Sequence, residues 1–144
     1  MQDRERLFLD TNILVYLANE DSPFHSTTSN KFKEVATHYE MWISRQVLRE
    51  YVVVMTRAGI VEKPLSANDV VADIAQWISC FNVADETKAV TNFLLEMIKK
   101  YDAKGKRIHD INIAATMQAY SIKKLFAMNK DDFAQIEEIE LISA

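Results

Sequence analysis

The chain has 144 residues, of which 49% are hydrophobic and 26% are charged, and its formal net charge is −4. That length predicts one domain over residues 1–144 with a sizeable core, and the many aromatic and branched aliphatic residues exclude general disorder. No apolar run is long enough to span a membrane, and the single cysteine excludes an internal disulfide framework. We expect a cytoplasmic protein without a membrane partner. The net negative charge argues against nucleic-acid binding by bulk charge.

Strand-like and helix-like segments alternate along the chain, and the links between them are short because the chain has only two glycines and two prolines. Strands are expected at residues 6–10, 41–43, 80–83, 124–128 and 140–142. Helices are expected at residues 11–19, 26–38, 45–58, 66–79, 85–101 and 109–120. This alternation predicts an α/β fold in which helices cover both faces of a mainly parallel sheet.

Local signals mark several ends of these elements. Ser44, Ser66 and Asp85 are predicted N-caps, because short polar side chains accept hydrogen bonds from the first free backbone N–H groups of a helix. Gly59 is the expected end of the helix over residues 45–58. Cys80 falls in a predicted strand, where a cysteine most often packs as a small buried apolar residue.

Oxygen-bearing side chains from four separate segments are expected at the carboxyl edge of the sheet, where ligands bind in open parallel sheets. They are Asp10, Glu50, Asp110, Asn129, Asp131 and Asp132. Carboxylate and amide oxygens suit Mg²⁺ or Mn²⁺, whereas the three scattered histidines and one cysteine do not suit zinc. Two such ions would hold an attacking water and the leaving oxygen of a phosphodiester.

Each of these residues also has a plain structural interpretation. Asp10 caps the next helix, and Asp110 favours its own helix N-terminus through the helix dipole. Glu50 lies beside Gln46 at the border between the wet and dry faces of its helix, where it would pair with a helix neighbour. The segment 129–132 forms a polar turn. The joint placement of all four segments at one edge favours a shared site.

A basic segment precedes Asp110. Residues 99–107 contain five basic side chains and one acid, and Lys106 and Arg107 come last. They form either a solvated helix end or a patch that steers phosphate toward the acids. His109 either contacts phosphate or serves as an ordinary solvent-facing histidine.

Four segments resemble the motifs of the PIN-domain family, and most closely its VapC-like toxins. Residues 8–16 (FLDTNILVY) resemble the opening strand and helix, and residues 43–51 resemble the second acidic motif. Residues 108–115 and 129–133 resemble the third motif and the closing asparagine-and-aspartate motif. The resemblance implies a three-layer α/β/α sandwich around a central five-stranded parallel sheet. It also implies Mg²⁺- or Mn²⁺-dependent ribonuclease activity.

The resemblance assigns roles position by position. The implied catalytic residues are Asp10, Glu50, Asp110, Asn129 and Asp132, and all except Asn129 are implied metal ligands. The implied residues that line the site or meet substrate are Thr11, Asn12, Ser44, His109, Lys106 and Arg107. Many relatives have aspartate where this chain has Asn129, and a threonine where it has Ala127. These departures leave open whether Asn129 or Asp132 fills the fourth position and whether one ion or two is bound.

The function expected from these features is that of an endoribonuclease toxin, which cleaves RNA with metal-activated water and is held in check by a cognate antitoxin protein. A housekeeping RNA-processing nuclease and a noncatalytic RNA- or protein-binding scaffold remain the alternatives. The apolar residues of the helices over 11–19 and 45–58 indicate either a core covered on both faces of the sheet or a surface for a second copy of the chain, which would give a homodimer.

Overall fold

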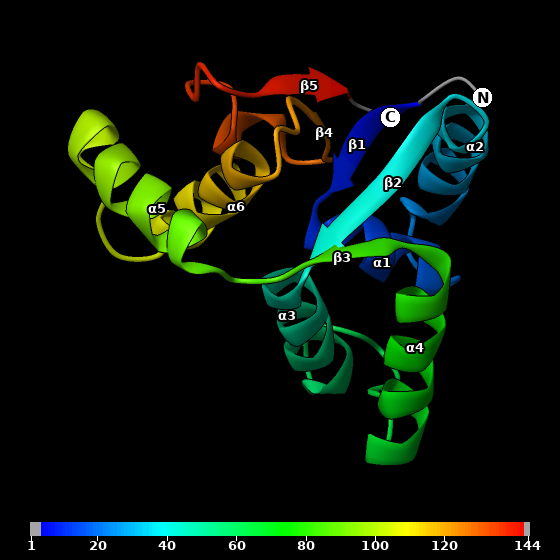
Figure 1. The fold of residues 1–144 in the computed structure, drawn as a ribbon. Helices are drawn as coiled ribbons and strands as arrows, with labels where there is room; N and C mark the ends of the chain where they lie inside the picture. Colours follow the sequence, from blue (N-terminus) through cyan, green and yellow to red (C-terminus); the bar gives the residue numbers. More distant parts are fainter. Residues whose placement is uncertain (1–3, 143–144) are drawn as a thin grey trace.

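The computed structural model describes residues 4–142, which build a five-stranded sheet. All strand pairs are parallel, and the strand order is β3-β2-β1-β4-β5 (Figure 1). The strands are β1 Glu5–Leu9, β2 Tyr39–Ser44, β3 Asn82–Ala84, β4 Lys124–Phe126 and β5 Glu140–Ile142. The helices are α1 Thr11–Ala18, α2 His25–Ala36, α3 Arg45–Thr56, α4 Ala67–Cys80, α5 Lys88–Tyr101, α6 Arg107–Ala119 and the short 3₁₀ helix η1 Lys130–Asp132. The predicted α/β fold with a five-stranded sheet is confirmed.

The helices form two groups on the sheet. α1 packs against α2 and α3, and α3 packs against α4, whereas α5 packs against α6. In Figure 1, α5 and α6 lie together on the left, and the other four helices lie to the right of the sheet and below it. Right-handed crossovers that run in opposite directions along a parallel sheet place their helices on opposite faces. The arrangement is therefore the predicted three-layer sandwich.

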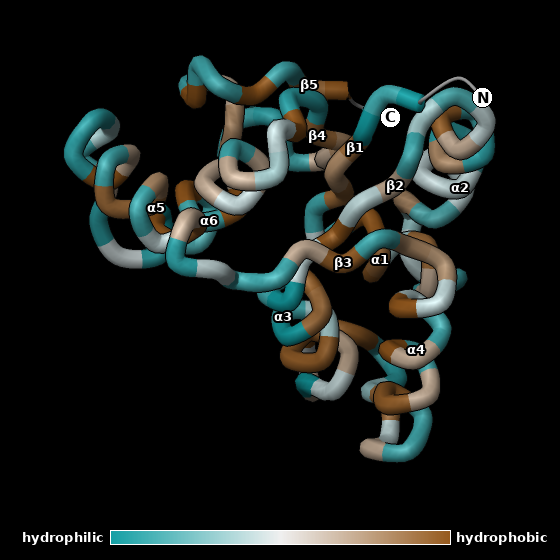
Figure 2. The backbone as a smooth tube through the Cα atoms, viewed as in Figure 1, coloured by the Kyte–Doolittle hydropathy of each residue, from teal (hydrophilic) through white to brown (hydrophobic). Residues whose placement is uncertain are grey.

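Strand β1 lies at the centre of the sheet, with β2 on one side and β4 on the other. Its residues Leu7, Phe8 and Leu9 are completely buried. A strand covered on both faces needs apolar side chains in succession rather than in alternation. Along α4 and α5, apolar and polar positions alternate, as expected for helices with one face toward the core (Figure 2). None of the helices within residues 4–142 has the length and apolar character needed to cross a membrane.

The chain reverses its direction across the sheet between β1 and β4. From β1 it proceeds through β2 to β3 at one edge, then returns to β4 on the far side of β1. Just beyond β1, the backbone N–H of Asp10 donates to the carbonyl oxygen of Phe126 at the end of β4, over 3.1 Å. Such a reversal opens a crevice at the carboxyl ends of the two strands, which is where ligands bind in this class of sheet.

Two of the three predicted N-caps are confirmed. Ser44 and Ser66 each accept a hydrogen bond from the backbone N–H three residues later. The third prediction is wrong, because the side chain of Thr87 caps α5. Asp85 instead forms an ion pair with Arg45, at 2.9 Å. Both residues precede the helix closely and both can cap, so the sequence alone did not separate them.

Most element boundaries differ from those predicted by one to three residues, and three of these differences concern residues that the sequence singled out. Helix α3 ends at Thr56, and Gly59 lies in the following turn with a φ of +89°. Cys80 is exposed and ends α4, so it is neither in a strand nor buried. Arg107 belongs to the first turn of α6 rather than to the preceding loop. This last change matters for the site, because it fixes Arg107 one helical turn from Asp110.

Candidate metal and nuclease site

Asp10 lies directly after the central strand and begins α1. Its side chain is only 7% exposed, and one carboxylate oxygen accepts a hydrogen bond from the backbone N–H of Thr11 at 2.8 Å. The plain interpretation of Asp10 as a helix cap is therefore confirmed. One hydrogen bond does not satisfy a buried carboxylate, which has about four acceptor positions.

Three other acids act on Asp10 through space. The pKa of Asp10 is raised to about 7, first by burial and then by the negative charges of Glu50, Asp110 and Asp132, against the opposing effect of the Thr11 N–H. The pKa of Asp110 is raised to about 6, first by burial and then by Asp132 and Glu50. Four carboxylates from α3, α6, η1 and the end of β1 are thus brought together, as the sequence predicted.

Glu50 is held from two sides within the cluster. The hydroxyl of Thr11 donates to one oxygen of Glu50 at 3.0 Å, and the side-chain amide of Gln46 donates to the other at 2.7 Å. Glu50 therefore does pair with a helix neighbour, as its plain interpretation supposed. The contact with Thr11, the residue after Asp10, also holds this carboxylate against the start of α1, so the two interpretations are compatible.

The segment after β4 contributes Asp132 rather than Asn129 as a charge. Residues 130–132 do form a short turn of 3₁₀ helix, and both Asn129 and Asp132 are exposed. Only Asp132, however, adds its charge to those felt by Asp10 and Asp110. Arg107 connects this turn to α6, because its guanidinium donates to the backbone oxygen of Asp132 and lies 3.6 Å from the carboxylate of Asp110.

Basic side chains of segment 99–107 pair with acids in three different parts of the structure. Lys100 pairs with Glu137 and Glu138 near the C-terminus, and Lys104 pairs with Asp102. Arg107 alone among these residues forms a salt bridge to an acid of the cluster, within the part of the chain that the structure describes. The segment is therefore not one continuous patch, although Lys106 is exposed at the start of α6.

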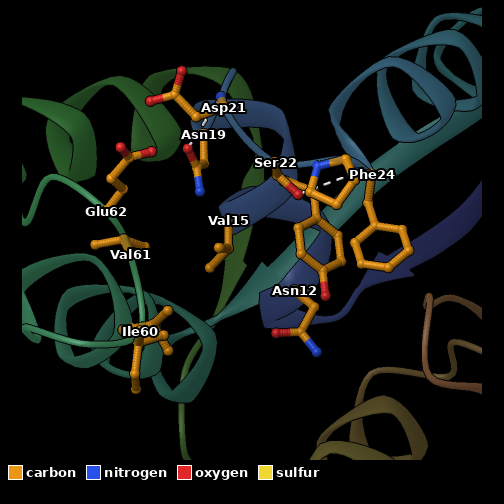
Figure 3. Close-up of a pocket in the computed structure, with 12 residues that line it drawn as sticks. Asn12, Val15, Asn19, Asp21, Ser22, Phe24, Ile60, Val61 and Glu62 are labelled. Carbon is orange, nitrogen blue, oxygen red and sulfur yellow. Dashed lines mark hydrogen bonds between the residues drawn. The ribbon is translucent and has the colours of Figure 1, made fainter.

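The remaining predicted residues lie around the cluster in different ways. Ser44 is fully buried as the cap of α3, and His109 is exposed while its backbone oxygen accepts from Gln46. Asn12 lines a separate pocket of about 340 Å³ between α1 and the segment after α3. Figure 3 shows Asn12 among the residues that line this pocket, with Phe24 and Ile60.

The donor set fits a hard divalent cation that keeps part of its water shell. Among residues 4–142, no group of three or more acidic, histidine or cysteine side chains is placed to hold a metal ion, so the fit rests on the oxygen chemistry of these donors. Mg²⁺ is commonly bound through one or two carboxylates and several waters rather than by a closed protein cage. Burial and neighbouring negative charges raise the pKa of Asp10 and of Asp110, and a cation at this edge would relieve that repulsion.

Two residues near the acids were not predicted. Gln46 is only 2% exposed, whereas the helical pattern placed it toward the wet side of α3. Its carbonyl oxygen accepts from the amide of Asn112 on α6, at 2.7 Å. The spacing of four residues between Gln46 and Glu50 was the one visible sign of this contact. The partner helix could not be identified without the fold.

The fold and the carboxylate cluster define an α/β domain with acidic side chains gathered at the reversal point of a parallel sheet. The PIN domain profile matches residues 7–139, and the chain therefore belongs to the PIN-domain family. No curated protein sequence matches the chain.

Solved structures of toxin–antitoxin proteins share this fold. The VapBC2 complex of Rickettsia felis, bound to a promoter DNA fragment, is similar with a TM-score of 0.70 and 20% identity over 96% of this chain and 98% of that one. A toxin–antitoxin complex from Klebsiella pneumoniae has a TM-score of 0.67 and 20% identity, over 93% of this chain and 95% of that one. The VapC20 toxin of Mycobacterium tuberculosis, described as cleaving the sarcin–ricin loop, has a TM-score of 0.68 and 20% identity, over 89% of this chain and 93% of that one. At this identity the likeness establishes the fold.

Proposed function

We propose that this protein is a Mg²⁺- or Mn²⁺-dependent endoribonuclease that acts as the toxin of a toxin–antitoxin pair. The observation that carries the proposal is the raised pKa of Asp10, which is buried and lies within range of the negative charges of Glu50, Asp110 and Asp132. A protein gains nothing in stability from crowding four carboxylates, so their assembly at a ligand-binding edge favours a cation-dependent activity. The similarity to a toxin described as cleaving RNA supports RNA as the substrate.

The side chains divide the work between binding and positioning. Asp10, Glu50, Asp110 and Asp132 would hold the ion, which supplies positive charge to polarise the scissile phosphate and to acidify a water molecule. Thr11 fixes the direction of the Glu50 carboxylate. Arg107 holds the turn that carries Asp132 against α6 and presents a positive charge beside Asp110, where a phosphate would approach.

RNA cleavage by the purified chain tests this proposal. Wild-type protein should cleave single-stranded RNA with Mn²⁺ and stop when a chelator is added. Asp10→Asn should reduce the rate at limiting metal by at least about 100-fold, the upper range for losing an outer partner of a metal ligand. The asparagine oxygen can still accept from Thr11, so the variant should fold. Metal-independent cleavage, or equal rates for the two proteins, would contradict the proposal.

Absence of any cleavage would favour the alternative of a noncatalytic scaffold. The exposed Asn129 in place of an acid was the reason for that alternative. Asp132 lies three residues further on and supplies a charge that reaches Asp10. The structure therefore offers a fourth carboxylate without Asn129, and Asn129→Asp is expected to leave metal-dependent cleavage in place.

For the antitoxin we propose an apolar segment that covers the pocket of Figure 3. Phe24 and Ile60, both on its walls, are 49% and 51% exposed, so two large apolar side chains are available there to a partner. Similar structures are complexes of toxin with antitoxin. Co-expression with the adjacent reading frame should relieve growth inhibition, and Phe24→Asp should restore toxicity in the co-expressing cells. Continued relief would place the partner elsewhere, and persistent inhibition by wild type would favour a housekeeping nuclease.

The proposed homodimer has less surface available than the sequence predicted. Ile13 and Leu14 of α1 are fully buried within the single chain, so α1 has few apolar residues to spare. On α3, Val53 is 53% exposed. We expect light scattering at micromolar concentration to give the mass of a dimer, and Val53→Glu to reduce it. A monomer mass for wild type would contradict the dimer.

A further inference from the structure

Gln46 is the most deeply buried uncharged polar side chain that contacts the acidic cluster. It lies in the first turn of α3, is 2% exposed, and its side-chain hydrogen bonds all involve Glu50 or residues of α6. A buried amide is costly unless its donors and acceptor are satisfied, so its partners show what the residue is for.

The amide of Gln46 uses both of its ends. The nitrogen donates to the Glu50 carboxylate at 2.7 Å and to the backbone oxygen of His109 at 2.9 Å. The oxygen accepts from the side-chain nitrogen of Asn112 at 2.7 Å. Asn112 also donates to Glu86, at 3.3 Å.

The direction of these bonds is determined by chemistry. The backbone oxygen of His109 and the carboxylate of Glu50 can only accept, so the Gln46 nitrogen must face them. The Asn112 nitrogen can only donate, so the Gln46 oxygen must face it. The amide therefore has one satisfied orientation, and in that orientation it joins α3 to the first turn of α6, which carries Asp110.

We propose that Gln46 is a positioning residue, which holds the Glu50 carboxylate in the metal-binding direction and sets the spacing between Glu50 and Asp110. The inference rests on the proposed metal-dependent function. The negative charges of Asp10, Asp110 and Asp132 repel the Glu50 carboxylate. The Glu50 side chain has three rotatable bonds, so without hydrogen bonds it would be free to turn away from them. The donors of Gln46 and Thr11 oppose this movement, and only the Gln46 contact also involves α6.

The test is Mn²⁺ binding measured by titration calorimetry, in the absence of RNA. Gln46→Met keeps the length and burial of the side chain and removes its hydrogen bonds. Partners that orient a metal ligand typically contribute 10- to 100-fold to metal affinity, so we expect at least a tenfold weaker binding. The matched control is Val47→Ala, the next residue of α3, which is fully buried and apolar. It should destabilise the fold while leaving Mn²⁺ affinity within twofold of wild type.

A second variant keeps the test valid if Gln46→Met does not fold. Asn112→Leu removes the donor that orients the Gln46 amide and should weaken Mn²⁺ binding by a smaller factor. Unchanged affinity in a folded Gln46→Met protein, or in Asn112→Leu if the first variant is unfolded, would overturn the positioning role. So would an equal loss in Val47→Ala. If wild type itself binds no Mn²⁺, the proposed function fails and this inference falls with it, an outcome distinct from an unaffected variant.

Discussion

In this protein, the surroundings of two groups of carboxylates shift their pKa values in opposite directions. Burial alone would raise the pKa of Glu138, but hydrogen bonds from Tyr101 and Lys100 outweigh it, and the pKa is lowered. Burial also raises the pKa of Asp10, but there the neighbouring charges are negative and the pKa rises to about 7. We term the first group, together with the side chains that bind it, the C-terminal clasp; it consists of Glu137, Glu138, Lys100 and Tyr101.

The difference lies in where the neutralising groups come from. In the clasp, the chain supplies its own cation, since Lys100 lies 3.1 Å from oxygens of both Glu137 and Glu138. In the acidic cluster of Asp10, Glu50, Asp110 and Asp132, the one salt bridge within residues 4–142 is that of Arg107 to Asp110. The clasp is complete without a ligand, whereas the cluster leaves negative charge to be balanced from outside.

Metal should therefore stabilise the protein through the cluster and not through the clasp. At a hundred times its Kd, a ligand that binds only the folded state adds about 2.7 kcal/mol, or roughly 5–10 °C in Tm for a domain of this size. Melting curves with Mn²⁺ or Mg²⁺ should show this rise for wild type and for Glu138→Gln. The double variant Asp10→Asn/Asp110→Asn should show no rise. Equal rises in all three proteins would place the ions elsewhere.

The two groups should also give stability opposite dependences on pH. Because the pKa of Asp10 is raised, the folded chain keeps a proton that the unfolded chain has lost between about pH 4 and about pH 7. Metal-free stability should fall across that window, by on the order of 2 kcal/mol once sharing of protons among neighbouring acids is allowed for. Glu138 has a lowered pKa, so its contribution is lost only as the pH falls below its ordinary value.

Denaturant unfolding at pH 5 and pH 8 with a chelator measures the first of these trends. The stability of Asp10→Asn should decline less than that of wild type between the two values. Parallel declines would show that Asp10 does not titrate in the window, and would remove the electrostatic argument for the cluster.

An effect on stability alone is expected from the clasp itself. The hydroxyl of Tyr101 donates to Glu138 and accepts from the backbone N–H of Glu137. Tyr101→Phe should cost about 1.5–3 kcal/mol of unfolding free energy, the usual value for losing a hydrogen bond to a charged group. Mn²⁺ affinity should be unchanged. A clear loss of affinity would mean that the two groups are coupled through α5 and α6.

The sequence was sufficient to predict the sheet and the acids. Buried runs such as that of β1, followed at once by Asp10, are typical of parallel strands covered on both faces. The strand order was not predicted, because the chain returns from β3 past two strands to reach β4. The sequence was insufficient for element ends, as Asp85 and Thr87 show, because two neighbouring residues can each cap a helix and only tertiary partners decide.

The fine structure of the site was less predictable. Gln46 lies on a face that is polar by helical periodicity, and α6 buries it only after the chain has closed. Cys80 is exposed because the strand after it begins two residues later than expected. Asp132 acts on Asp10 through its charge, whereas which of Asn129 and Asp132 contacts a bound ion stays a prediction.

The central claim is that the cluster, and not the clasp, awaits a cation. Titration calorimetry with Mn²⁺ on wild type, Asp10→Asn and Glu138→Gln tests it most directly. The account predicts binding by wild type, unchanged affinity in Glu138→Gln, and a loss of at least about 100-fold in Asp10→Asn, beyond the cost of losing an outer partner. Unchanged affinity in Asp10→Asn, or no binding by wild type, would contradict it.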